Sequence, residues 1–115
     1  NTMLKYFLLT LSLLSFNNLS NENYTEPFLG MWSEVHSGEI VQIFRGDNSD
    51  VHFERFLDSK LAASGKIYAE EYEIKVERSD IELKYKLNYA FSPNEQVLSI
   101  TKPNSVESWL LFRIR

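Results

Sequence analysis

The sequence of 115 residues contains no cysteine. This absence excludes disulfide bonds, thiolate zinc sites, cysteine nucleophiles and attachment of a lipid to a cysteine. Small exported domains are often held together by disulfides. A domain of this length must therefore gain its stability from an apolar core or from a partner, and its margin of stability is thin because a short chain buries a small share of its surface.

Glycine and proline are scarce, with four and three residues, which excludes a collagen-like chain and a Gly/Pro-rich disordered chain. The sequence also has no glycine-rich phosphate loop, and its serines have neither a glycine elbow nor an evident histidine partner. These absences remove the usual signatures of nucleotide-binding proteins and serine hydrolases.

No block of like charge interrupts the chain, whose 16 acidic and 12 basic residues are interspersed and give a formal net charge of −4. A nucleic-acid-binding protein carries a basic patch, and a protein held electrostatically on an anionic membrane carries a polybasic run. The mixed, mildly acidic composition therefore predicts neither nucleic acid nor an anionic membrane surface as the partner.

The chain is poor in metal-ligating and catalytic groupings. His36 and His52 are the only histidines, and His52 shares a strand face with Glu54, but a metal site needs a third or fourth ligand and none is evident. Carboxylate pairs such as Glu70 with Glu71 have no context that places them across a cleft. We therefore expect no metal, no cofactor, no catalytic residue and no enzymatic activity.

Aromatic residues are abundant at 14%, and large rings give a small domain much of its burial. From Phe28 onward, apolar residues recur with a period of two. The clearest run alternates apolar with polar or charged residues, which is typical of a strand with one face in the core and one in water; its apolar members are Ile81, Leu83, Tyr85, Leu87, Tyr89 and Phe91.

Similar runs separated by turn-forming residues predict eight strands. They are expected over residues 30–36, 39–45, 51–57, 61–69, 71–78, 81–91, 96–102 and 107–115. In the last strand, alternation groups Leu110 and Phe112 with Ile114 as the apolar face. There is no room for helical crossovers, so we predict an all-β domain whose strands form an antiparallel up-and-down meander closed into a small barrel.

Residues 1–20 are interpreted as a secretory signal peptide, with Met3 as the native start and residues 1–2 as additions before it. Lys5 precedes an apolar run over residues 6–16, which has the form of a signal and is shorter than a membrane span of about 20 residues. An uncleaved anchor or a segment packed on the domain remains an alternative. Residues 21–27 are expected to be a linker and residues 28–115 the barrel domain, in a secreted or periplasmic protein.

Gly30-Met31-Trp32 opens the first expected strand, and Arg113 and Arg115 lie in the last. In this order of features, residues 28–115 resemble the lipocalin and calycin architecture, whose first strand carries Gly-x-Trp and whose final strand brings a basic residue against the Trp. The resemblance implies a structural role in closing the barrel for Gly30, Trp32, Arg113 and Arg115. The domain is about half the usual length and has no flanking helix, so the resemblance implies a fold more than an activity.

Two functions follow from this architecture. Lipocalin-like proteins typically bind small apolar molecules, so the first is an exported protein that binds an apolar or amphipathic ligand in the barrel mouth through Tyr85, Tyr89, Phe91 and Trp109. In the second, the same bulky residues fill the barrel, and the outer surface and loops bind another protein, as an inhibitor or assembly partner. A cavity inside the barrel would favour the first function.

Arg55 places a charge in register with the apolar Val51 and Phe53. We expect Arg55 to lie near a strand end, where its guanidinium reaches solvent. The alternatives are a pair with a carboxylate, or an inward-pointing guanidinium that orients an anionic ligand group.

Overall fold

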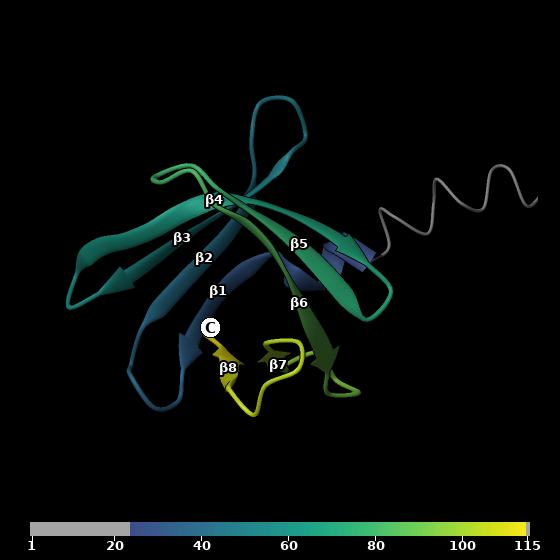
Figure 1. The fold of residues 1–115 in the computed structure, drawn as a ribbon. Helices are drawn as coiled ribbons and strands as arrows, with labels where there is room; N and C mark the ends of the chain where they lie inside the picture. Colours follow the sequence, from purple (N-terminus) through teal and green to yellow (C-terminus); the bar gives the residue numbers. More distant parts are fainter. Residues whose placement is uncertain (1–23, 115) are drawn as a thin grey trace, which may run out of the picture.

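The strands form a single closed ring in the computed structural model, which describes residues 24–114 (Figure 1). Each strand pairs antiparallel with the next in the chain, and the first pairs with the last. The elements are the 3-10 helix η1 (Glu26–Phe28) and the strands β1 (Gly30–Glu34), β2 (Ile40–Arg45), β3 (Val51–Leu57), β4 (Lys60–Glu70), β5 (Glu73–Arg78), β6 (Lys84–Phe91), β7 (Val97–Thr101) and β8 (Ser108–Arg113). The all-β, eight-stranded meander closed into a barrel is confirmed. The expected signal peptide, residues 21–23 of the expected linker and Arg115 lie outside the described residues, whereas residues 24–27 of that linker lead into η1.

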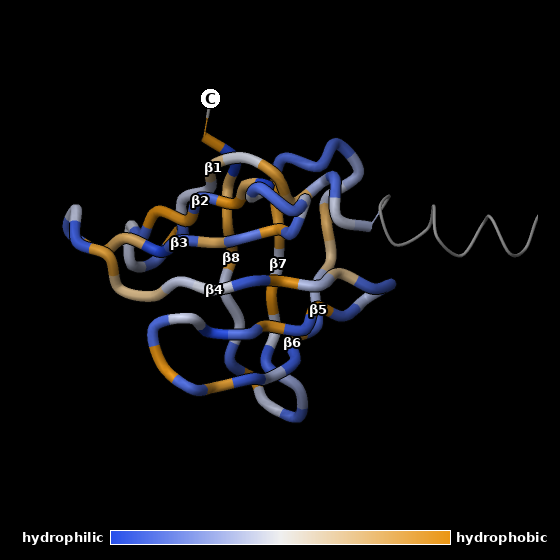
Figure 2. Tube along the Cα trace, turned by 90° about the horizontal axis from the view of Figure 1, so that it is seen from above, coloured by the Kyte–Doolittle hydropathy of each residue, from blue (hydrophilic) through white to orange (hydrophobic). Residues whose placement is uncertain are grey.

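The core lies inside the ring because alternate residues of each strand point inward. Figure 2 shows the resulting alternation of hydrophobic and hydrophilic segments along the strands. The buried inner residues are mostly of moderate size: Val41, Ile43, Val51, Phe53, Ala63, Ile67, Ala69, Ile74, Val76, Leu98 and Leu111. These side chains form one hydrophobic cluster along the inner wall.

The strand limits lie within two residues of the sequence prediction except at the start of β6. The alternating pattern begins at Ile81, but the ladder between β5 and β6 begins with the pair Glu77 and Lys84. Ile81 and Leu83 lie in the turn before β6 and are exposed. The periodic pattern therefore extends past the end of the strand.

The inner face of β8 is opposite to the one that alternation indicated. Leu111 is 4% exposed, whereas Phe112 is 44% exposed. The cause is the ladder with β1, in which Arg113 lies opposite Trp32, because directly opposed residues point to the same face. Trp109 shares the inner face with Leu111 and Arg113. The assignment of Leu110, Phe112 and Ile114 to the inner, apolar face was therefore wrong.

The two ends of the barrel differ. One end, which we call the closed end, carries η1 and the β2–β3, β4–β5 and β6–β7 turns. The other end, the mouth, carries the β1–β2, β3–β4, β5–β6 and β7–β8 turns; the first three of these lie at the left of Figure 1, away from the β4–β5 turn at the right. Phe28 of η1 is fully buried and forms the floor of the barrel.

A contact network around Arg113 holds the closed end together. Its guanidinium carbon lies 4.2 Å from the centre of the Trp32 ring. Its Nη1 donates a hydrogen bond to the Leu29 carbonyl at 2.8 Å and its Nη2 to the Pro27 carbonyl at 2.7 Å. The Trp32 indole Nε1 donates to the Phe28 carbonyl at 2.9 Å. These bonds join β1, β8 and η1 across the floor.

Gly30 is required at this point for two reasons. Its φ of +130° is a conformation that side chains of L-residues rarely adopt, and a Cβ added there would lie 2.8 Å from Nη1 of Arg113. A side chain at position 30 would therefore strain the backbone and displace the guanidinium from the floor.

Candidate functional site

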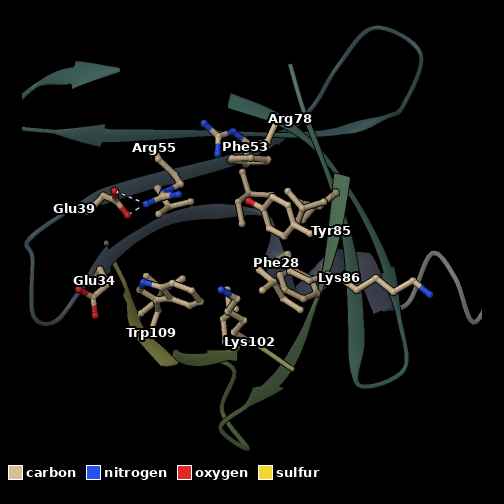
Figure 3. Close-up of a pocket in the computed structure, with 18 of the residues that line it drawn as sticks. Phe28, Glu34, Glu39, Phe53, Arg55, Arg78, Tyr85, Lys86, Lys102 and Trp109 are labelled. Carbon is tan, nitrogen blue, oxygen red and sulfur yellow. Dashed lines mark hydrogen bonds and ion pairs between the residues drawn. The ribbon is translucent and has the colours of Figure 1, made fainter. Parts of the chain in front are cut away.

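The interior of the barrel contains a cavity of about 580 Å³ that extends from the mouth to Phe28. Ligand sites usually occupy roughly 300–1,000 Å³. The cavity wall is apolar and is formed by Val41, Ile43, Phe53, Ile67, Ile74, Val76, Leu87, Ile100 and Leu111. Charged and aromatic residues lie around its opening (Figure 3). The cavity is therefore an apolar well with a polar entrance.

The four residues expected to bind a ligand lie in two places. Tyr85 of β6 and Trp109 of β8 line the cavity. Tyr89 and Phe91 lie nearer the closed end, where each packs edge-to-face on Phe28 with ring centres 4.8 Å apart. Tyr89 also donates a hydrogen bond from its hydroxyl to a backbone carbonyl at 2.6 Å. These two rings support the floor, while Tyr85 and Trp109 face the space above it.

Arg55 follows Val51 and Phe53 on the inner face of β3 and lines the cavity near the mouth. Its Nε and Nη2 donate to the two carboxylate oxygens of Glu39 at 3.0 and 2.8 Å, and Glu39 is buried (Figure 3). The arginine thus pairs with a carboxylate, the alternative left open by the sequence, rather than ending free in solvent. The pair uses Nε and Nη2, so Nη1 is left over to bind a further acceptor.

A second arginine lies close to Tyr85. Arg78 of β5 donates from Nε and Nη2 to Asp80 at 2.7 and 2.6 Å, and it lines the cavity just above Tyr85 in Figure 3. The Asp80 carboxylate, with a contribution from the Tyr85 hydroxyl, raises the pKa of Arg78, and the Arg78 guanidinium holds the pKa of Asp80 well below its usual range. Both groups are therefore charged at all physiological pH values.

Glu34, at the end of β1, is a carboxylate that is only 3% exposed. One oxygen accepts hydrogen bonds from the backbone of His36 and from the backbone and hydroxyl of Ser37, and the other accepts from the backbone of Leu110 at 3.4 Å. Burial disfavours the charged form, but these donors outweigh it and lower the pKa of Glu34. Glu34 is an internal cap that fixes the β1–β2 turn to β8.

Lys102 differs from the two arginines because no carboxylate of the described residues lies within ion-pair distance of its Nζ. It follows β7 at the mouth and lies beside Trp109, turned toward the cavity, whereas Lys86 is turned away (Figure 3). The opening therefore presents to an incoming ligand an ammonium group outside any ion pair, an indole and a phenol, together with the Glu107 carboxylate.

The described residues 24–114 contain no group of three or more His, Asp or Glu side chains that could hold a metal ion. His52 stacks on Phe44, with ring centres 5.6 Å apart. Within the same range, no helix has the length and apolar character needed to cross a membrane.

A comparison with protein-family models found no match to the chain, and neither did comparisons with curated proteins and with solved structures.

Proposed function

We propose that the protein is an exported, non-catalytic, lipocalin-like carrier that binds one small amphipathic molecule inside the barrel. The apolar part of the ligand lies in the well, and its polar end stays at the mouth. The observation that carries this proposal is the cavity of about 580 Å³ with an apolar wall. The alternative, a filled barrel that acts only through its outer surface, is less favoured because it requires a packed interior.

The groups at the mouth favour a ligand whose polar end is an anion. Lys102 and the remaining Nη1 of Arg55 can only donate hydrogen bonds, and both are positively charged. Tyr85 and Trp109 add a hydroxyl and an indole N–H to the same opening. A carboxylate, sulfate or phosphate accepts such bonds and compensates the charge of Lys102, whereas an ammonium does neither.

The proposal is tested by titrating the protein with dodecanoate and, as a matched cation of equal chain length, dodecylamine. Trp109 provides the signal because it lines the cavity, while Trp32 is fully buried at the closed end. We expect dodecanoate to change the fluorescence of the wild type and not that of Trp109→Phe, and to bind about tenfold more tightly than dodecylamine. Absence of binding by either compound would overturn the proposal.

Filling the well tests the same proposal without touching the mouth. Val76 is a buried residue of the cavity wall, so Val76→Phe replaces a small aliphatic side chain with an aromatic ring that extends into the empty space. We expect affinity for dodecanoate, measured by calorimetry, to fall about tenfold or more, while the midpoint of thermal unfolding is kept or raised because added contacts fill a void. Met31→Phe, on an exposed position of β1, is the matched control and should bind like the wild type.

A further inference from the structure

Most of the large exposed aliphatic residues among residues 24–114 lie at the mouth; the exceptions, Met31 and Ile114, lie side by side at the start of β1 and just after β8. Each of the four mouth turns or its flanking strand ends carries at least one such side chain: Val35, Leu57, Leu61, Ile81, Leu83 and Val106. Val106 is 100% exposed, and the other five are between 42% and 55% exposed. We call these six residues the aliphatic rim. A single exposed aliphatic residue is ordinary, but one or more on every turn of the same end is not.

The described turns of the closed end lack such a rim. The turns over residues 46–50 and 92–96 are made of glycine, proline and polar residues. Tyr72 in the β4–β5 turn is the one large apolar residue in the closed-end turns that is strongly exposed, at 72%. Burial inside the barrel does not explain this asymmetry, because both sets of turns project beyond the core.

The arrangement of the rim fits a fluid surface better than a second protein. The six side chains lie on four separate turns around an opening, so they do not form the continuous, well-packed patch of about 800 Å² per partner that a stable protein interface needs. The boundary between headgroups and acyl chains accepts separate aliphatic side chains, because lipids rearrange around each one. Leu83 belongs both to the rim and to the cavity lining, so a lipid layer at the rim would be continuous with the apolar well.

The charges around the rim indicate the kind of lipid. The mouth turns carry both signs next to one another: Asp58, Lys60, Asp80, Glu82, Lys84, Lys102 and Glu107. A mixed set of this kind has no net attraction for an anionic bilayer, which needs a cluster of basic residues. Contact with lipid would therefore depend on the aliphatic side chains and would change little with ionic strength.

We propose that the barrel docks mouth-first on the surface of a zwitterionic lipid bilayer, with the aliphatic rim inserted at the level of the headgroups. This docking goes beyond the carrier function and needs no ligand in the cavity. A failure to bind dodecanoate would leave the docking intact, and a failure to dock would leave the carrier function intact.

The chain has no cysteine, so one introduced cysteine can carry an environment-sensitive dye at a single site. The full-length variants Val106→Cys and Tyr72→Cys place the dye at the mouth and at the closed end. On addition of phosphatidylcholine vesicles, we expect a blue shift of dye emission at position 106 and none at position 72. The shift should persist in about 0.5 M salt, which screens electrostatic attraction to the lipid headgroups.

Both labelled chains contain the apolar run of residues 6–16, so attachment through that run alone is a competing result. The described part of the chain begins at the closed end, where Tyr24 precedes η1, so this competing result would shift the dye at position 72 or neither dye. Either result would overturn the proposal. A shift at position 106 that depends on protein concentration and not on vesicles would also overturn it, because it would identify a second copy of the chain as the occupant.

Substitution of the rim provides a second measurement. The double variant Leu61→Ser with Ile81→Ser changes two exposed side chains from different turns, and Tyr72→Asn is the matched control at the other end. We expect vesicle flotation to show an about tenfold lower partition coefficient for the double variant and no change for the control. Equal partition of the wild type and the double variant would overturn the proposal.

Discussion

At the scale of single residues, the stability of the closed end depends on the planar fork of Arg113. Arg113→Lys keeps the charge but loses the stacking on Trp32 and most of the bonds to the Leu29 and Pro27 carbonyls. We expect urea unfolding to show a loss of about 2–3 kcal/mol. The control is Arg45→Lys, whose ion pair with Glu26 is largely exposed and should contribute less than about 1 kcal/mol. Equal losses would contradict the role assigned to Arg113.

Glu34 gives the fold a dependence on acid pH. Folding lowers its pKa below the ordinary value of 4.5, so the carboxylate stabilises the folded state fully at pH values above 4.5. That stabilisation is lost as the pH falls from 4.5 through the folded-state pKa. The difference in unfolding free energy between wild type and Glu34→Gln should therefore be constant near neutral pH and shrink in acid. Glu54→Gln, on the outer face of β3, is the control, and a difference between wild type and Glu34→Gln that did not change with pH would contradict this assignment.

The polar contacts at the mouth were largely beyond prediction from the sequence. The pattern placed Arg55 in register with Val51 and Phe53, and that register is what turns it inward. Its partner Glu39 lies 16 residues away, just before β2, and no local pattern links the two. Lys102 entered the sequence prediction as the last residue of the strand expected over residues 96–102. Its position beside the cavity depends on closure of the whole ring.

At the scale of elements, the start of β1 depends on Gly30. Gly30→Ala should destabilise the barrel by about 2–4 kcal/mol, because it adds a strained φ and a close contact with Arg113. Gly38→Ala is a matched control: Gly38 also has a positive φ, but an added Cβ there meets nothing within 4 Å. Its cost should be about 1 kcal/mol. Thermal unfolding of both variants measures the difference, and equal costs would show that the contact with Arg113 is unimportant.

The strands themselves were predictable because the period of two and the turn residues are local signals. Prediction failed where the sequence gives several equally apolar choices. In β8, Leu110, Leu111 and Phe112 are consecutive, so alternation alone cannot decide which of them faces inward. The pairing of Arg113 with Trp32 decides which residues of β8 face inward. That pairing joins the first and last strands, which are far apart in the sequence.

At the scale of the whole molecule, a bound ligand should stabilise the entire barrel, because every strand from β1 to β8 contributes a residue to the cavity lining. Dodecanoate at a concentration of 100 Kd should add about 2.7 kcal/mol to the free energy of unfolding. For a domain of this size that corresponds to a rise of roughly 10–20 °C in Tm, measurable by scanning calorimetry. Val76→Phe should show a much smaller rise at the same ligand concentration, and an equal rise would place the ligand outside the cavity.

The seam between β1 and β8 also bears on how the protein is made. It joins residues 32–34 to residues 111–113, so the ring closes only after β8 has left the ribosome. Until then β1 and β7 each present an unpaired edge, the kind of surface that recruits strands from other chains. Completion of the barrel therefore waits for synthesis of its last strand, and the unfinished sheet exposes edges that a chaperone covering strand edges would protect.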